Sequence, residues 1–249
     1  MKEEKPLCVH FVQHEAFEAP GAILAWAKDR KYNINFSRVY NFEPLPQTIE
    51  TIDLLVVMGG PQSPHTTKEE SPHFDAESEI SLIRSCINAG KAVVGVCLGA
   101  QLIGESLGSA VERSPEKEIG VFPIQLTSDG LSDKKVAHFG PVLMVGHWHS
   151  DMPGLTDQSK ILAGSIGCPR QIVAYSNLVY GFQCHMEFTP DVVELLIAEE
   201  LDFLSTNITH RFVQKPNEIR NNNYLEMNQK QHQFLDNLMA NYLLSRRLV

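Results

Sequence analysis

The sequence has no hydrophobic run that approaches the roughly 20 apolar residues needed to cross a bilayer. Residues 1–6 carry acidic side chains where a secretion signal needs a basic region. Basic residues are also scarce, because 21 Lys and Arg against 30 Asp and Glu leave a net charge of −9, the wrong sign for holding phosphate backbones. We therefore expect a cytoplasmic protein that partners neither a membrane nor a nucleic acid.

Paired cysteines are missing as well. The five cysteines are odd in number, lie far apart and never form a C-x-x-C pair: Cys8, Cys86, Cys97, Cys168 and Cys184. This pattern predicts neither a disulfide framework nor a cysteine zinc site. Each thiol therefore has to be judged by its own surroundings.

What the first half of the chain does contain is an alternation of short apolar runs with helical periodicity. The predicted strands are residues 7–13, 34–39, 53–58 and 92–96, and the predicted helices are residues 21–31 and 77–89. This order is typical of an α/β fold, in which a mostly parallel central sheet has helices on both faces. Shorter apolar segments beyond residue 107 predict antiparallel additions to the sheet.

The C-terminal part is predicted to be helical. Thr189 followed by Pro190 is a favourable helix start, and residues 224–244 place apolar side chains on one helical face. We assign residues 1–205 to one α/β domain and residues 206–249 to a C-terminal helical extension. Its final segment, residues 217–249, could cover the sheet, form a dimer contact or dock a synthetase, and a helix packed on its own domain is the simplest of these interpretations.

Residues 95–99 read Gly-Val-Cys-Leu-Gly and lie where a predicted buried strand meets a predicted helix. This spacing is typical of a nucleophile elbow, a sharp turn that projects the central side chain and needs small neighbours. The sulfur of Cys97 would lie near a helix N-terminus, which favours the thiolate. A cysteine alone, however, is more often a small buried apolar residue.

A thiolate nucleophile needs a base and a group that orients the base, and one of the ten histidines has such a neighbour. His185 and Glu187 alternate along a predicted strand end, so both side chains lie on one face. A His-x-Glu pair alone commonly marks a solvated strand end. Its occurrence together with the Cys97 elbow favours a catalytic Cys-His-Glu set.

Three motifs follow one another along the chain: Gly-Gly-Pro at 59–61, Cys-Leu-Gly-Ala-Gln at 97–101 and Gly-Phe-Gln-Cys-His-Met-Glu at 181–187. In these motifs the chain resembles class I glutamine amidotransferases of the triad type. It resembles most the glutaminase domain of GMP synthetase and its stand-alone relatives, with further matches at residues 118–120 and 147–151. The resemblance covers about residues 7–204 and implies the flavodoxin-like fold of that family.

The resemblance implies a role for each motif residue. Cys97 would attack the side-chain amide of glutamine through a γ-glutamyl thioester, His185 would move protons, and Glu187 would orient His185. The residues implied to stabilise the oxyanion or to bind substrate are Gly59, Gly60, Leu98 and Gln101. Glutamate and ammonia would be the products.

Two departures from the family pattern qualify this expectation. Cys184 and Met186 stand where the family usually carries phenylalanine and proline, so the packing beside the catalytic histidine should differ. The chain also has no serine- and glycine-rich pyrophosphatase loop and no G-x-x-x-x-G-K-[ST] signature. We therefore expect no ATP or other cofactor, and a separate synthetase partner would have to accept the ammonia.

Three alternatives remain open. A γ-glutamyl peptide or conjugate hydrolase would use the same Cys97 thioester chemistry on a different substrate. A module that only binds would be favoured if His185 lay far from Cys97. His147-x-His149-x-Asp151 resembles part of a binuclear zinc motif, but that motif continues with histidine and this chain with methionine, so we expect no metal.

Overall fold

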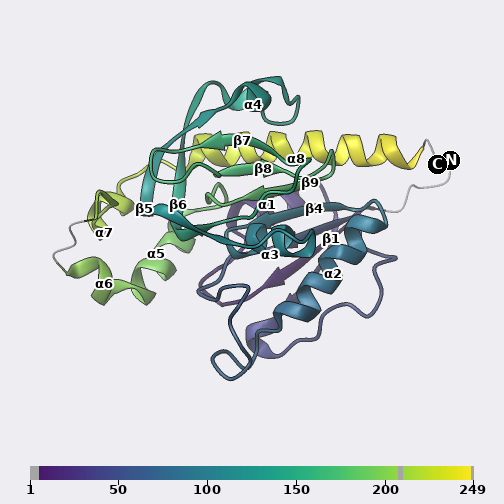
Figure 1. Cartoon of the computed structure of the whole chain (residues 1–249), viewed down its shortest axis with the longest axis horizontal. Coiled ribbons are helices and arrows are strands. Elements are labelled where there is room, and N and C mark those ends of the chain that lie inside the picture. Colours follow the sequence, from purple (N-terminus) through teal and green to yellow (C-terminus); the bar gives the residue numbers. More distant parts are fainter. Residues whose placement is uncertain (1–5, 207–209, 248–249) are drawn as a thin grey trace.

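The structure is a computed structural model that describes residues 6–206 and 210–247. Its centre is one mixed sheet in the order β10-β5-β7-β8-β9-β4-β3-β1-β2, with β6 paired to β5 (Figure 1). The strands are β1 Cys8–Gln13, β2 Asn33–Arg38, β3 Leu54–Val57, β4 Ala92–Val96, β5 Glu112–Leu126, β6 Val142–Met152, β7 Lys160–Gly164, β8 Ile172–Ala174, β9 Val179–Phe182 and β10 Phe212–Val213. The helices are α1 Gly21–Asp29, α2 Ala76–Asn88, α3 Leu98–Ser106, α4 Ser128–Ser132, α5 Pro190–Glu199, α6 Leu201–Ser205, α7 Pro216–Arg220 and α8 Leu225–Arg246.

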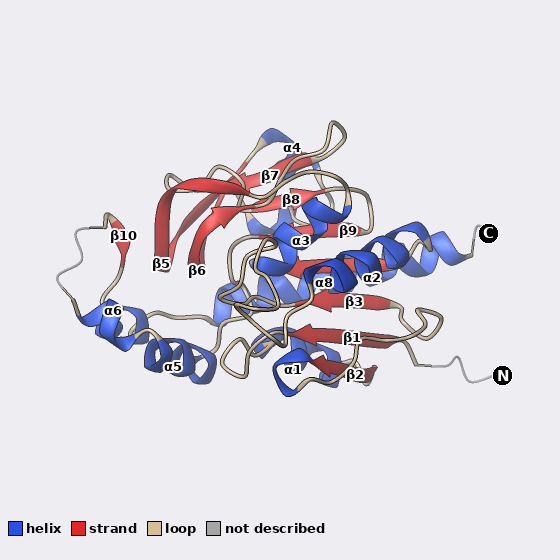
Figure 2. Cartoon of the chain, turned by 60° about the horizontal axis from the view of Figure 1, so that its bottom comes forward, coloured by secondary structure: helices blue, strands red, loops and turns tan. Residues whose placement is uncertain are grey.

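The predicted fold class is confirmed. Strands β2, β1, β3, β4 and β9 pair in parallel and lie side by side, as Figure 2 shows, whereas β5 to β8 are antiparallel additions. Apolar residues alternate between two cores along each central strand: Leu54 and Val56 face one core, and Leu55 and Val57 the other. A parallel strand covered on both faces needs this continuous apolar run.

The helices divide between these two cores. Side chains of α1 and α8 belong to the first core, and side chains of α2 and α3 belong to the second. Two short 3-10 helices, at Val39–Asn41 and Ala137–Phe139, complete the connections. No helix among residues 6–206 and 210–247 is both long and apolar enough to span a membrane.

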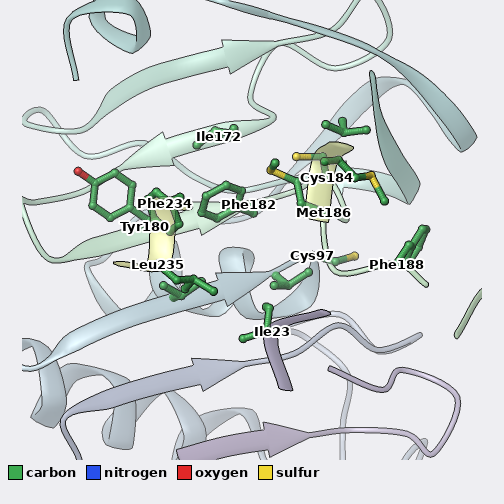
Figure 3. Close-up of a cluster of buried hydrophobic side chains, with 14 of the residues drawn as sticks. Ile23, Cys97, Ile172, Tyr180, Phe182, Cys184, Met186, Phe188, Phe234 and Leu235 are labelled. Atoms are coloured by element: carbon green, nitrogen blue, oxygen red, sulfur yellow. The ribbon is translucent and has the colours of Figure 1, made fainter. Parts of the chain in front are cut away.

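The predicted C-terminal helix is present as α8 and lies against the sheet. The ring of Phe234 packs edge-on against Tyr180 and Phe182 of β9, with centroids 5.1 and 4.9 Å away (Figure 3). Asp236 accepts a hydrogen bond of 2.8 Å from the Trp26 indole of α1 and also pairs with Arg30. Helix α8 therefore shares its apolar core with the α/β layers, while the division at residue 205 stays a prediction.

A short helix precedes α8. Residues 216–223 include the short helix α7, which begins at Pro216. The side chain of Glu218 accepts a hydrogen bond of 2.7 Å from the backbone N–H of Lys215, so the first turn is capped. Just before it, β10 adds a two-residue parallel edge to β5.

Candidate active site

The site lies where neighbouring parallel strands end. Strand β3 leads into Gly59 and Gly60, β4 leads into Cys97, and the chain after β9 leads to His185. The carboxyl ends of parallel neighbours meet at one edge of the sheet, which is where open α/β sheets bind ligands. The predicted motifs are therefore brought together by the strand order.

Cys97 forms the predicted elbow. Its backbone has φ 51° and ψ −108°, a conformation that residues other than glycine rarely adopt, and its N–H donates to the Phe182 carbonyl at 2.7 Å. A Cβ on Gly95 would overlap the backbone of Gly99, and a Cβ on Gly99 would overlap the Val57 carbonyl. The flanking glycines are therefore required by close packing between β4, α3 and β3.

His185 and Glu187 form a buried pair. Nδ1 of His185 lies 2.7 Å from Oε1 of Glu187, and both side chains are almost fully buried. The backbone N–H of His185 donates to the Gly146 carbonyl at 2.8 Å, and the imidazole stacks on Phe188 with centroids 4.5 Å apart. These contacts fix the ring position, while Nε2 forms no hydrogen bond of good geometry within the described chain.

The charge state of His185 reflects opposing effects. Burial lowers its pKa, but the charge and hydrogen bond of Glu187, together with the neighbouring Cys97, outweigh burial and leave the pKa well above its usual value. A raised pKa favours an imidazolium beside the sulfur. The imidazole is therefore close enough to Cys97 to interact with it, as a proton-transfer pair requires.

Gln183 also contacts the sulfur, although its sequence motif assigned it no role. Its Nε2 donates to Sγ of Cys97 at 3.4 Å, and its Oε1 accepts from the amide of Gln101 at 3.2 Å. Gln101 itself is buried and lines the cavity beside Cys97. The motif at 181–187 is the signal that could have pointed to Gln183.

The cavity in front of Cys97 has a volume of about 400 Å³. Its walls carry charges of both signs, from Glu18, Arg113, Lys117, Asp151, Glu199 and Glu200. Arg113 pairs with Asp151 at 3.1 Å, and Lys117 lies 4.0 Å from Glu200. The cavity can therefore accept a ligand that carries an ammonium and a carboxylate.

Three backbone N–H groups near the sulfur are left without acceptors. Those of Gly59, Gly60 and Leu98 donate to no atom within the described ranges, whereas the flanking Met58 and Gly99 N–H groups are both bonded. Gly59 and Leu98 are buried, and buried N–H groups without a partner are rare in folded proteins, whereas Gly60 is partly exposed to the cavity. Because they lie beside Cys97, these N–H groups could donate hydrogen bonds to a ligand oxygen.

Glu18 is a site residue that sequence reasoning missed. Its side chain is only 7% exposed, lines the cavity, and approaches Gly59 so closely that a Cβ there would lie 2.6 Å from Oε2. Burial, reinforced by Glu187 and only partly offset by the charge of His185, raises the pKa of Glu18 to about 7. It follows a strand without a recognisable motif, so only the fold reveals it.

The histidines of the zinc-like motif belong to a hydrogen-bonded network. Ligand atoms of Glu118, His147 and His149 lie within 4.8 Å of one another. The amide nitrogen of Gln171 donates to Oε2 of Glu118 at 2.6 Å and lies 3.2 Å from Nε2 of His149. Asp151 pairs with Arg113 instead. We interpret this set as a link between β5, β6 and the residue that precedes β8.

The charge states fit this interpretation. Burial lowers the pKa of His147 to about 3 and places the pKa of His149 well below its usual value. Burial also raises the pKa of Glu118 to about 6, despite hydrogen bonds from Ser165 and Gln171. Neutral imidazoles can accept and donate within such a network without an ion.

Comparisons with known proteins agree with this architecture. The family model for class-I glutamine amidotransferase matches residues 26–200. The glutamine amidotransferase-like protein YfeJ of Salmonella typhimurium is 57% identical over 92% of this chain and 96% of its own length. The GMP synthase of the same organism is 32% identical over 54% of this chain, a match that covers only 25% of that enzyme.

Solved structures show the same fold. The crystal structure of SMU.1228c has a TM-score of 0.90 at 48% identity, covering 93% of this chain and 99% of that one. A glutamine amidotransferase from Thermotoga maritima has a TM-score of 0.83 at 21% identity over 95% and 99% of the two chains, which supports the fold alone. On the family match, the high identity to YfeJ and the shared fold, this chain belongs to the class I glutamine amidotransferase family.

Proposed function

We propose that this chain hydrolyses the side-chain amide of glutamine to glutamate and ammonia, with Cys97 as nucleophile. The observation that carries the proposal is the buried His185–Glu187 pair beside a cysteine on a strained elbow. Members of the family are cysteine-dependent amidotransferases. Geometry and family membership therefore support one chemistry.

The chemistry follows from these contacts. The Cys97 thiolate adds to the amide carbon, and the resulting oxyanion accepts hydrogen bonds from free N–H groups, for which Gly59, Gly60 and Leu98 are the candidates. Each such donor is worth about 2.7–4 kcal/mol in the transition state. His185 passes its proton to the nitrogen, the C–N bond breaks, and ammonia leaves a γ-glutamyl thioester.

Water completes the cycle. The neutral imidazole of His185 now takes a proton from water, whose oxygen attacks the thioester, and glutamate leaves as the thiolate returns. Glu187 holds Nδ1 throughout, which keeps Nε2 as the atom that exchanges protons. Gln101 and the charges around the cavity would bind the amino acid head group.

A γ-glutamyl peptide or conjugate is the alternative substrate. A cavity of about 400 Å³ falls in the range that holds drug-sized ligands, so it leaves space for a leaving group larger than ammonia. The acyl half of the reaction is the same for both substrates. If ammonia is instead transferred, a separate synthetase partner would accept it.

The test compares glutamine with a panel of γ-glutamyl peptides, measuring glutamate release and ammonia. Wild type, Cys97→Ala and Cys86→Ala are assayed together. Cys86 lies on α2, is buried in the second core, and serves as the matched control. We expect hydrolysis of glutamine by wild type and Cys86→Ala but not by Cys97→Ala. Hydrolysis of peptides alone would replace the glutaminase with the γ-glutamyl hydrolase, and equal rates in all three proteins would reject both.

A further inference from the structure

His14, which directly follows β1, is a fully buried histidine between two hydrogen-bond acceptors. Its Nδ1 lies 2.9 Å from the Gly59 carbonyl, and its Nε2 lies 2.8 Å from Oε2 of Glu79 on α2. Glu79 is only 2% exposed, and Phe74 packs edge-on against the imidazole. The pair thus links α2 to the loop that carries Gly59 and Gly60.

Both nitrogens of His14 can bond as donors only in the imidazolium form. Burial lowers its pKa, but the charge and hydrogen bond of Glu79, the hydrogen bond to Gly59 and the charge of Glu18 together raise it above its usual value. A charged donor makes a stronger hydrogen bond than a neutral one. The Gly59 carbonyl is therefore held firmly on the side of His14.

The direction of that carbonyl determines the direction of the next N–H group. No cis peptide occurs within the described ranges, so the C=O of Gly59 and the N–H of Gly60 point in opposite directions. His14 is shielded from the cavity, whereas Gly60 lines it together with Cys97. A carbonyl that faces His14 consequently turns the Gly60 N–H towards the cavity side.

This peptide needs an external restraint. Glycine has little conformational preference of its own, so a peptide between two glycines can rotate more readily than any other. The N–H of Gly60 has no acceptor among the described residues that would hold it in place. The hydrogen bond from His14 is the contact that fixes its plane from the opposite side.

We propose that His14 and Glu79 are positioning residues that hold the Gly59–Gly60 peptide with its N–H directed at the space beside Cys97. The oxyanion hole is then built before a substrate arrives. Neither side chain touches the substrate. The inference rests on the proposed function only in that Cys97 is a nucleophile whose acyl transfer passes through an oxyanion.

Two double variants isolate the restraint. His14→Leu/Glu79→Gln removes the donor to Gly59, and His14→Asn/Glu79→Gln retains a side-chain N–H near the position of Nδ1. Leucine and asparagine are similar in size, and the shared Glu79→Gln change avoids an unpaired buried carboxylate. The two proteins therefore differ chiefly in whether residue 14 can hold the Gly59 carbonyl.

The readout is the ratio of two reactions of Cys97, each followed by intact-protein mass spectrometry. With p-nitrophenyl acetate, the thiolate adds to the ester carbonyl, an oxyanion forms and collapses, and p-nitrophenolate leaves an acetyl thioester. With iodoacetamide, the thiolate displaces iodide from carbon and no oxyanion forms. Cys97→Ala gives the background for both, and neither reaction requires that glutamine be the substrate.

We expect the acylation-to-alkylation ratio to fall by about 10²-fold in His14→Leu/Glu79→Gln, since loss of one oxyanion donor costs about that much. The asparagine variant should stay within about threefold of wild type. Equal ratios in all three proteins, or an equal fall in both variants, would overturn the proposal. His10→Asn is the control for a buried histidine on β1, since His10 bonds Ser37 instead, and it should leave the ratio unchanged.

A measurement on wild type covers the case in which the variants do not fold. Nitrogen-15 NMR of labelled histidine should show Nδ1 of His14 protonated over the pH range of the assay, and an unprotonated Nδ1 would contradict the restraint.

Failure of the proposed function would give a different result. Wild type would then hydrolyse neither glutamine nor γ-glutamyl peptides while the ratio still depended on residue 14.

Discussion

Glu18 should reduce the stability of the folded protein above neutral pH. Its carboxyl group lies in the wall of the cavity, close to Gly59 and Cys97, and burial raises its pKa from 4.5 to about 7. The unfolded chain loses this proton near pH 4.5, whereas the folded protein keeps it until about pH 7. The free energy of unfolding therefore falls as the pH rises through this interval.

The magnitude follows from the two pKa values. A difference of about 2.5 pKa units at 1.36 kcal/mol each lowers the free energy of unfolding by about 3 kcal/mol. This destabilisation is absent below pH 4.5 and complete above pH 7. Glu18→Gln preserves the size of the side chain and removes the charge. We expect this variant to match wild type within about 0.5 kcal/mol at pH 4 and to exceed its stability by about 3 kcal/mol at pH 8.

Urea unfolding of both proteins at pH 4 and pH 8 measures the difference. Glu199→Gln is the matched control, because Glu199 lines the same cavity but is exposed, and it should shift stability by less than about 0.5 kcal/mol at either pH. A Glu18→Gln variant that is less stable than wild type at pH 8 would show that Glu18 is not destabilising there. A stabilisation of equal size at both pH values would show that the effect does not come from the charge of Glu18.

Three further predictions concern the His185–Glu187 pair, the elbow and the C-terminal helix. Glu187→Gln should lower kcat about 10²–10⁴-fold, because the carboxylate that orients His185 loses its charge, and an unchanged kcat in a steady-state assay would contradict this role. Gly99→Ala should lower both the melting temperature and the rate of Cys97 alkylation, since its Cβ overlaps backbone, and a wild-type melting curve would argue against the elbow geometry. Phe234→Ala should lower the free energy of unfolding in urea by about 3–5 kcal/mol, whereas Leu243→Ala, at an exposed position of the same helix, should lower it by about 0.5 kcal/mol. Equal losses would show that α8 does not pack on the sheet.

Much of the fold could be predicted because its strands carry local signals. The run at 53–58 is apolar at every position but its first, and a buried parallel strand needs such a run, so β3 was predicted from pattern alone. In strand β5, Glu112–Leu126, only the second half has the apolar pattern of a strand. Its first half is charged and contains a register shift between Arg113 and Glu118, which hides the alternation. The two-residue β10 has no pattern that a sequence could reveal.

Some residues of the candidate site could likewise be predicted from local motifs, and others could not. Cys97, His185 and Glu187 are predicted by short motifs, since an elbow and a strand end impose spacing over a few residues. The His14–Glu79 pair joins residues that are 65 positions apart, and it exists only because β1 lies next to β3 and α2 covers the same sheet. Contacts of this kind depend on the tertiary fold and leave no local signal.

Detection of the acyl-enzyme shows directly whether Cys97 is the nucleophile. Wild type and Cys97→Ala are mixed with glutamine, quenched in acid within the first turnover and analysed by intact-protein and peptide mass spectrometry. We expect an adduct with the mass of glutamine less ammonia on Cys97 of wild type, and none on the variant. Release of glutamate by Cys97→Ala at the wild-type rate, or an adduct on any other residue, would contradict it.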